Sequence, residues 1–524
     1  MSSRLARIAQ AATLVMAAYV VSRVLGLARE MIVARQFGTS AELGAYLAAF
    51  RVPDLIFQLL AGGALGSSLI PVLSEYLAHG QHREGWRLAS AIYNLVGFLT
   101  TGFALLAFAG ARPLAQVLVP GYSPELQALT SQLMRLMLVT PIIFGLSGVS
   151  MAVLNAHQHF LLPAIAPILY NLAIIAGAVW LAPQMGVHGL AIGVVVGSGL
   201  HLLVQLPGLL RRGWRWFPTW GRHLPGVRQV IRLLLPRVLG LAVVQINFIV
   251  STRLASRLEP GSLPALNYAF LLMMLPQGVF AMALATAAFP AFSDLVARQQ
   301  IPELRHTLMV MLRATLFLAL PAAAGLYILR NPVIAVLLEG GRFTDASTKA
   351  VAWALQFYVL GLPAYAIVEI LSRAFYALHD TRTPVLVGAA TVALNIALSL
   401  ALLGSMGIGG LALANAVAVN VEMVWLLWFM HKWLDGLEGD RLLSATLRVV
   451  GATAAMAVAL YSVMRVMGGG YPGWLVAAAG GIIGGGVFVA SAWICQVSEV
   501  RAVGNWLAGR LLSRRQRPGS AAQR

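Results

Sequence analysis

The chain has 524 residues, of which 59% are hydrophobic and 10% charged, and its formal net charge is +19. A soluble domain carries about 25% charged residues, so this composition excludes a soluble globular protein. Because about 20 apolar residues form one helical membrane span, the chain is predicted to be an all-α polytopic membrane protein. The single cysteine, Cys495, excludes a disulfide framework and a cysteine-rich metal site.

Hydropathy and turn residues predict fourteen transmembrane helices along the chain. The expected spans are 9–36, 42–77, 85–110, 124–155, 159–182, 187–211, 226–256, 262–297, 303–329, 346–378, 382–404, 407–433, 442–467 and 472–496. Basic residues gather in the connections that follow even-numbered spans, and in the tail at Arg510, Arg514, Arg515 and Arg517. The positive-inside rule therefore predicts that both termini are cytoplasmic.

The positive charge has two interpretations. Arginines alternate with Trp214, Trp216 and Trp220 in one connection, a composition that also occurs in nucleic-acid binders. Because this connection lies between two membrane spans, an interfacial amphipathic linker is favoured. We therefore expect contact with anionic membrane lipids and no nucleic-acid partner.

The chain contains an internal repeat. The segment Arg23-Val-Leu-Gly-Leu-Ala28 recurs as Arg237-Val-Leu-Gly-Leu-Ala242, residues 64–78 align with 283–297, and 185–191 align with 406–412. Six spans per unit give two units that enter the membrane in the same direction, a parallel repeat with substrate between the halves. The predicted organisation is an N-terminal lobe (1–212), an amphipathic linker (213–225), a C-terminal lobe (226–435), two added helices (436–498) and a basic cytoplasmic tail (499–524).

The first predicted span carries charges that hydrocarbon does not tolerate freely. Arg23, Arg29 and Glu30 have apolar sequence on both sides, and a charge at the bilayer centre costs about 2.5–3.5 kcal/mol on insertion scales. We expect Arg23 and Arg29 to line a central cavity and to meet an anionic substrate. Glu30 is expected to orient an arginine or to bind sugar or peptide, whereas Arg35, near the helix end, is expected to snorkel.

The second predicted span contains Arg51, Pro53, Asp54 and the pair Gly62–Gly63. Pro53 and the two glycines predict kinks. Arg51 and Asp54 are three residues apart, which leaves two alternatives. The two side chains pair with each other, or Arg51 joins Arg23 and Arg29 in binding an anion. A guanidinium suits a diphosphate because its planar donors bind two oxygens at once.

Later spans supply polar side chains and few charges. Asn267 is a candidate substrate contact, and Pro276-Gln-Gly278 predicts a helix break. Amides and hydroxyls in apolar helices are more often interhelical hydrogen-bond partners than ion ligands. Glu369 and Arg373 have the i, i+4 spacing that favours mutual pairing.

No catalytic arrangement, metal-ligand cluster or phosphate-binding P-loop is found in the sequence. We therefore expect neither an enzyme nor a bound metal or other cofactor. Transport would draw on an ion gradient, on the membrane potential or on consumption of the product.

Four segments carry a resemblance to a known family. These are SRVLGLAREMIVARQFG (22–38), AFRVPDLI (49–56) with GALGSSLIPVLSEY (63–76), ALNYAFLLMMLPQGVFAMALATAAFPAFS (265–293), and RAFYALHDTRTPV (373–385) with GIGGLALANAV (407–417). Together they resemble the MurJ family of lipid II flippases, part of the multidrug/oligosaccharidyl-lipid/polysaccharide exporter superfamily. The resemblance covers nearly the whole chain.

The resemblance implies two six-helix lobes around a central cavity, and a final helix pair that forms a groove for a polyprenyl tail. It implies export of lipid II, an undecaprenyl-diphosphate-linked disaccharide pentapeptide, by alternating access across the bacterial cytoplasmic membrane. We expect a functional monomer whose partners are lipid II and membrane lipids. Arg23, Arg29 and Glu30 match the charged first-helix motif of the family, and Arg51 matches a basic position in its second helix.

The chain also departs from the family pattern. Charged residues usual in the family are replaced at Gly44, Phe57–Gln58, Gly62 and Phe270–Leu271. A cation site described for some members would fall at Ser251, Asn395, Ser399 and Asn415, where no carboxylate remains. These four residues form either a cation site or polar contacts between helices. Transport would be coupled either to the membrane potential or to a monovalent cation.

Two other functions fit parts of the sequence. An exporter of another polyprenyl-linked glycan would share the arginines and would suit the charge-poor eighth span. A cation-coupled drug exporter should carry intramembrane carboxylates, for which Glu369 is the strong candidate in the second lobe.

Overall fold

The computed structural model describes residues 2–437, 439–467 and 470–501, so the basic residues Arg510, Arg514, Arg515 and Arg517 of the predicted tail lie outside the described residues. The helices of the first half are α1 (Ser2–Phe37), α2 (Ala41–Leu60), α3 (Gly63–Ala78), α4 (His82–Ala109), α5 (Ala111–Leu118), α6 (Pro124–Met137), α7 (Thr140–Ala156), α8 (Leu161–Ala176), the π-helix η1 (Gly177–Leu181), α9 (Ala182–Met185), α10 (Val187–Leu203) and α11 (Leu206–Arg211). The remaining helices are α12 (Pro225–Ala255), α13 (Ser262–Ala297), α14 (Ile301–Leu338), α15 (Asp345–Tyr358), the 3-10 helix η2 (Val359–Gly361), α16 (Leu362–Ala377), α17 (Arg382–Met406), α18 (Ile408–Trp433), α19 (Gly439–Met467) and α20 (Gly473–Ile494).

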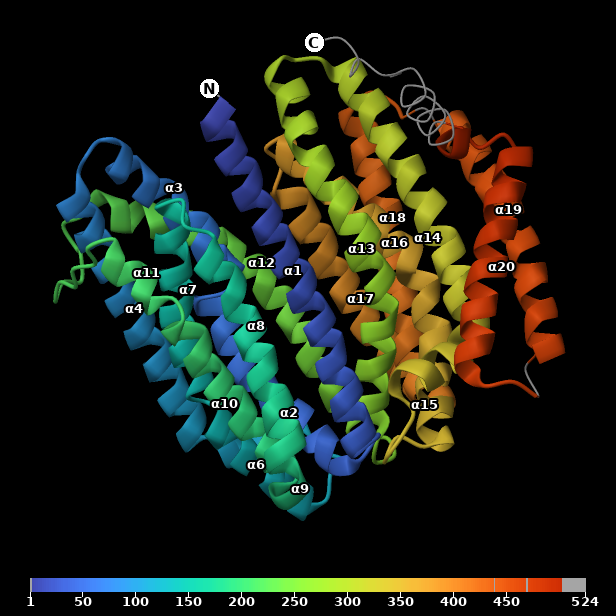
Figure 1. The fold of residues 1–524 in the computed structure, drawn as a ribbon, viewed down its shortest axis with the longest axis horizontal. Coiled ribbons are helices and arrows are strands. Elements are labelled where there is room, and N and C mark those ends of the chain that lie inside the picture. Colours follow the sequence, from blue (N-terminus) through green and yellow to red (C-terminus); the bar gives the residue numbers. More distant parts are fainter. Residues whose placement is uncertain (1, 438, 468–469, 502–524) are drawn as a thin grey trace, which may run out of the picture. The chain divides into compact units, whose positions relative to one another are not determined.

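This architecture confirms the predicted polytopic all-helical fold (Figure 1). Within the described ranges, 12 helical segments are long and apolar enough to cross a membrane, and 13 if the bent helix α12 counts as one span. They coincide with the second to fourteenth predicted spans. The 36-residue helix α1 occupies the position of the first.

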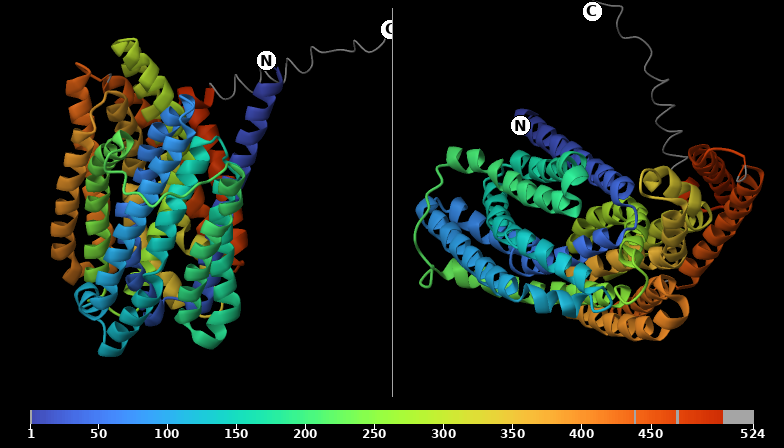
Figure 2. Two further views of the ribbon diagram at one scale, coloured as in Figure 1. Left: turned by 90° about the vertical axis from the view of Figure 1, so that its left-hand side faces the viewer. Right: turned by 90° about the horizontal axis from the view of Figure 1, so that it is seen from below.

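The described residues form two compact units. The first unit contains the residues up to Ala265 together with Leu338–Ser347, and the second contains Leu266–Leu337 and the residues from Thr348 onward. In the first unit α8 and α10 lie side by side, as Figures 1 and 2 both show, and α12 packs on α2 and α3. The division into lobes, linker, terminal pair and tail that the repeat suggests remains a prediction.

Each unit has its own apolar core. In the first unit Leu65, Leu69 and Ile92 are buried where α3, α4 and α7 meet. In the second unit Phe292 and Phe375 are buried among α13, α14, α16 and α18. The connection 213–224 is not helical, and its aromatic residues pack on α4, where Trp220 contacts Phe98 at a ring-centroid distance of 5.5 Å.

The second span of each repeat copy was expected to be interrupted by glycine or proline. In the first copy this span is α2 with α3, and in the second copy it is α13. The first of these spans is interrupted after Leu60, and Gly62 separates α2 from α3 in the way the glycine pair predicted. The prediction of a break at Pro276-Gln-Gly278 is wrong, because α13 runs without interruption from Ser262 to Ala297. A proline removes one backbone donor, and a membrane helix tolerates this loss without ending.

The backbone repeats along with the sequence. Positive φ angles occur at Gly80 and Gln299, at Gln158 and His379, and at Gly186 and Gly407, which are pairs separated by 219, 221 and 221 residues. Gly186 (φ 58°, ψ −139°) precedes α10, and Gly407 (φ 55°, ψ −128°) precedes α18. Because a side chain is strained at such angles, the shared sequence Met-Gly builds the same turn in both units.

Candidate functional site

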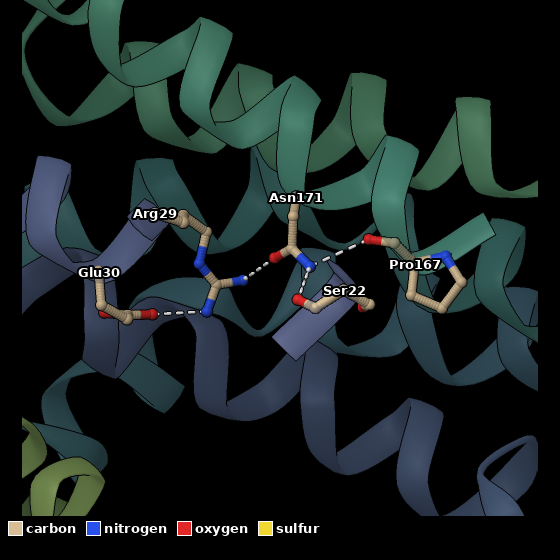
Figure 3. Close-up of polar contacts among 5 residues, drawn as sticks. All are labelled: Ser22, Arg29, Glu30, Pro167 and Asn171. Atoms are coloured by element: carbon tan, nitrogen blue, oxygen red, sulfur yellow. Dashed lines mark hydrogen bonds and ion pairs between the residues drawn. The ribbon is translucent and has the colours of Figure 1, made fainter. Parts of the chain in front are cut away.

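Arg29 lies at the centre of a polar cluster in the first unit. Its Nη1 donates a hydrogen bond to Oδ1 of Asn171 on α8 (3.1 Å), and its Nη2 pairs with Oε1 of Glu30 (2.5 Å). Figure 3 shows the guanidinium between these two partners. Its side chain is 25% exposed, and that of Glu30 is 16% exposed. A guanidinium has five N–H donors, so the two bonds orient Arg29 without using all of them.

Asn171 was not among the residues predicted from the sequence. Its side chain is buried, and its amide nitrogen donates to the backbone oxygens of Pro167 (3.0 Å) and Ser22 (3.4 Å). The side chain therefore ties α8 to α1 at the level of Arg29. Six residues after Asn171, α8 passes into the π-helical segment Gly177–Leu181, a distortion that often occurs at functional sites.

Arg51 and Asp54 both contact α12. Arg51 donates from Nε to Oγ1 of Thr252 (3.2 Å), and its guanidinium carbon lies 5.0 Å from the ring centroid of Phe248. Asp54 accepts a hydrogen bond from the buried amide of Gln245 (3.1 Å). These contacts place the two charged residues of α2 along one seam with α12.

Helix α12 also contacts α3 through an arginine that the sequence analysis did not select. Arg237 of α12 donates from Nη1 to the hydroxyl oxygens of Ser67 and Ser68 on α3, the latter at 3.4 Å. Arg237 is exposed. The repeat offered a signal for it, because Arg237 is the counterpart of Arg23 in the duplicated Arg-Val-Leu-Gly-Leu-Ala segment.

The other predicted site residues fall in several places. Arg23 is exposed and donates to the hydroxyl of Tyr19 from Nε (3.2 Å) and Nη2 (2.6 Å). Asn267 is half-buried on α13 in the second unit, and Ser251 is half-buried on α12 in the first. How these residues combine in a bound state remains a prediction.

The remaining predicted polar residues make hydrogen bonds within the second unit. Ser399 donates to Oδ1 of Asn395 (3.4 Å), and both residues lie buried on α17. Tyr365 of α16 donates to Oδ1 of Asn415 on α18 (2.8 Å). The predicted pairing of Arg373 with Glu369 is confirmed at 2.9 Å.

Packing explains two of the departures from the charged family pattern. A Cβ atom at Gly44 would lie 2.4 Å from the hydroxyl oxygen of Tyr122, so Tyr122 fills the space that an acidic side chain would need. Burial raises the pKa of Tyr122 to about 12, and its phenol is therefore neutral. Phe270 stands in an aromatic group with Tyr358 and Tyr365, at ring-centroid distances of 5.5 and 6.4 Å.

No group of three or more His, Cys, Asp or Glu side chains suited to a metal ion occurs among the described residues. His157 instead stacks on Trp86, with ring centroids 5.3 Å apart.

Comparison with known proteins places these contacts in a family. The model of the lipid II flippase MurJ family matches residues 33–478. The chain belongs to the MurJ family. A relative named lipid II flippase MurJ, from Burkholderia cenocepacia, is 33% identical over 78% of this chain and 81% of its own length. A probable lipid II flippase MurJ from Vibrio cholerae is 30% identical over 81% of this chain and 83% of its own length.

Solved structures agree with this membership. A structure of the lipid II flippase MurJ in an inward closed conformation has a TM-score of 0.80 and 26% identity, and covers 92% of this chain and 98% of its own. An inward-facing multidrug resistance MATE transporter has a TM-score of 0.67 at 15% identity, over 79% of this chain and 95% of its own. The second likeness shows that the MurJ family and the MATE transporter share a fold.

Proposed function

We propose that this chain is a lipid II flippase, which moves the undecaprenyl-diphosphate-linked peptidoglycan precursor from the cytoplasmic to the outer leaflet by alternating access. The observation that carries the proposal is membership of the MurJ family over residues 33–478. A flippase moves its substrate without covalent chemistry, so the chain is a transporter and not an enzyme. It would act as a monomer in the bacterial cytoplasmic membrane, with both termini on the cytoplasmic side.

The diphosphate would be bound by arginines of the first unit. Arg29 is the principal candidate, because Asn171 and Glu30 hold its guanidinium in place while a quarter of the side chain stays exposed. Such preorganisation lowers the entropic cost of binding. Arg23 and Arg51 would add positive charge, and Glu30 would keep Arg29 oriented when no phosphate is present.

Arg51 and Asp54 would participate through α12. Their bonds to Thr252 and Gln245 hold α2 against α12 in the described arrangement. An arriving phosphate would compete with Thr252 for the guanidinium of Arg51, because a charge-assisted bond is stronger than a bond to a neutral hydroxyl. Binding would thereby weaken this seam and favour the movement that alternating access requires. Asn267 would contact the sugar or peptide portion.

The polyprenyl tail would lie in a groove of the second unit that is lined by α19, but not by α20, of the predicted terminal helix pair. A cavity of about 1240 Å³ is bounded by α14, η2, α16 and α19, and its lining includes Leu320, Ile328, Val359, Ala457 and Val458. The polar residues of its lining are Tyr327, Thr453, Tyr461, Ser462 and Arg465. An isoprenoid chain is apolar throughout, and a groove with these side chains would hold it by the same transfer free energy that buries apolar side chains.

Reconstitution tests the proposal directly. Proteoliposomes with fluorescent lipid II in the inner leaflet should expose label to an external quencher only when the protein is present. Depletion of the protein in its host should cause lipid II to accumulate on the cytoplasmic side. Accumulation of a different polyprenyl-linked glycan, with no movement of lipid II, would assign the chain to that glycan.

A further inference from the structure

Glu422 is an intramembrane carboxylate that the proposed transport mechanism does not use. It is half-buried in the middle of α18, between Val421 and Met423. None of the ion pairs among the described residues includes Glu422. An ionised carboxylate without a cationic partner is unfavourable in the hydrocarbon layer, and such residues usually have a function.

The geometry around Glu422 suits a protonated acid. Its Oε2 lies 3.4 Å from Oγ1 of Thr391, a buried residue on α17. The hydroxyl of Thr391 also donates to the backbone oxygen of Gly388 at 3.0 Å. A hydroxyl has one proton and two lone pairs. With its proton directed to Gly388, the Thr391 oxygen can accept a hydrogen bond from the O–H of a protonated Glu422. Gly388 leaves room for the carboxyl group, since a Cβ there would lie 3.7 Å from Oε1.

The charged groups of the helices packed with α18 have partners other than Glu422. On α14, which shares the core of the second unit with α18, Arg305 donates to the backbone oxygen of Leu434 and Arg313 pairs with Glu499 at 3.7 Å. On α16, the phenols of Tyr365 and Tyr376 interact electrostatically with Glu422 and are uncharged groups. Arg373 on the same helix is bound to Glu369 at 2.9 Å, which makes the pair neutral overall. The charged residue of α17 is Arg382, in its first turn, and η2 consists of Val359, Leu360 and Gly361.

We propose that Glu422 is a proton-binding site whose carboxyl group donates to Thr391 in the described arrangement and releases its proton to water when α17 and α18 open to solvent. A proton needs one acceptor, which Thr391 supplies. Metal cations that prefer oxygen take about six or more ligands, and one carboxylate with one hydroxyl falls short of that set. The proton site stands on its own, whereas its role in driving transport rests on the proposed function.

Infrared difference spectroscopy on the full chain in nanodiscs tests proton binding without any transport. The wild type should show the C=O stretching band of a protonated carboxylic acid, and that band should disappear on titration to alkaline pH. The band should be lost in Glu422→Gln and retained in the control Glu303→Gln, which removes an exposed carboxylate from the first turn of α14. Persistence of the full band in Glu422→Gln would overturn the proposal.

A milder variant keeps the test decisive if Glu422→Gln does not fold. Thr391→Val removes the hydroxyl and keeps the shape, so the carboxyl band should shift because its hydrogen bond is lost. An unshifted band would remove Thr391 as the partner and overturn the site as described. Displacement of the band by sodium chloride, but not by choline chloride, would overturn it in favour of a cation site.

Transport measurements then test coupling. Lipid II flipping by the wild type should change several-fold with an imposed pH gradient, and Glu422→Gln should flip at a rate that does not respond to the gradient. An unchanged pH response in Glu422→Gln would overturn the coupling. A wild type that moves no lipid II under any condition would refute the proposed function and leave the infrared result intact.

Discussion

The two copies of the repeat have the same backbone turns and different charges. The residues that end α3 and α13, Ala78 and Ala297, are 219 positions apart, which is also the spacing between the positive-φ residues Gly80 and Gln299. At this spacing Gly62 aligns with Ala281, and Arg51 aligns with the Phe270–Leu271 region. The first copy is interrupted and basic, whereas the second is continuous and aromatic.

This difference shows which features the repeat preserves. Turn geometry depends on single glycines and helix ends, and it is the same in both copies. Polar chemistry depends on side-chain partners, and it has diverged: arginines with Asn171, Thr252 and Ser67 in the first unit, and a carboxylate with Thr391 in the second. The repeat therefore preserves the backbone turns and not the polar side-chain contacts.

The largest effect is expected from Arg29→Ala. The variant removes a charged donor from the first unit, and two charge-assisted hydrogen bonds to phosphate are together worth about 3 kcal/mol or more, roughly a hundredfold in affinity. Growth of a flippase-depleted strain should not be restored, although the protein should be folded by size-exclusion chromatography. Arg298→Ala is the matched control, because Arg298 is exposed and paired with Asp294 at the end of α13.

Full growth with Arg29→Ala would contradict the assignment of the headgroup to the first unit. Arg29→Lys is expected to restore growth only in part, since an ammonium group cannot form the paired planar bonds of a guanidinium.

The next largest effect is expected when the glycines that interrupt the first copy are replaced by the corresponding residues of the second copy. In Gly62→Ala/Gly63→Met the first copy acquires the Ala281–Met282 sequence of the second. A Cβ at Gly62 would lie 2.9 Å from the backbone oxygen of Gln58, so we expect a loss of about 1–3 kcal/mol of stability from overpacking. Thermal unfolding in detergent measures this loss, and an unchanged midpoint would show that the interruption is not required. Ala281→Gly is the reciprocal control in α13.

The shared turn predicts equal effects in the two units. Gly186→Ala and Gly407→Ala each place a Cβ at a positive φ in open space, with no atom within 4 Å of the new group. Each should cost about 1–2 kcal/mol from backbone strain alone, and the double variant should show the sum. Unequal single effects would indicate that the two turns are not equivalent.

The smallest predicted effect is a loss of folding stability in acid, which depends on a histidine in the first unit that has no titratable counterpart in the second. Burial lowers the pKa of His157, and the positive charge of nearby Arg212 lowers it further. The hydrogen bond to the Val153 oxygen raises the pKa, but by less than burial lowers it. A base with a depressed folded-state pKa contributes full stability above its unfolded pKa of about 6.5. This stability is lost as the pH falls from that value through the lower folded-state pKa. Unfolding midpoints of the wild type should therefore decrease in mild acid.

His157→Phe should reduce this acid sensitivity while keeping a ring against Trp86. The counterpart of His157 at the spacing of 221 residues is Leu378, which does not titrate. An equally steep acid loss in His157→Phe would place the sensitivity elsewhere.

The fold could be predicted from the sequence because span length and hydropathy follow directly from the thickness of the bilayer. The break at Gly62 was predictable as well, whereas the expected break at Pro276 was not found, because a membrane helix tolerates one missing donor. Arg29 and Glu30 could be selected from their cost in hydrocarbon.

Asn171, the hydrogen-bond partner of Arg29, could not be selected from the sequence. An amide in an apolar run has many possible partners, and Asn171 is 142 residues away from Arg29. Tyr122, which fills the space beside Gly44, is likewise remote in sequence, 78 residues further along the chain. Glu422 was overlooked because the sequence alone does not show that α16 and α17 provide it with hydroxyl groups and no free cation among the described residues.

The central claim is that the arginines of the first unit bind a diphosphate headgroup. Equilibrium binding of a short-chain lipid II analogue to the protein in nanodiscs tests it most directly, with the matching monophosphate as competitor. Arg29→Ala is expected to weaken binding of the diphosphate by roughly a hundredfold, the size of two lost charge-assisted hydrogen bonds, and to abolish the preference over the monophosphate. Equal affinity and preference in wild type and Arg29→Ala would contradict it.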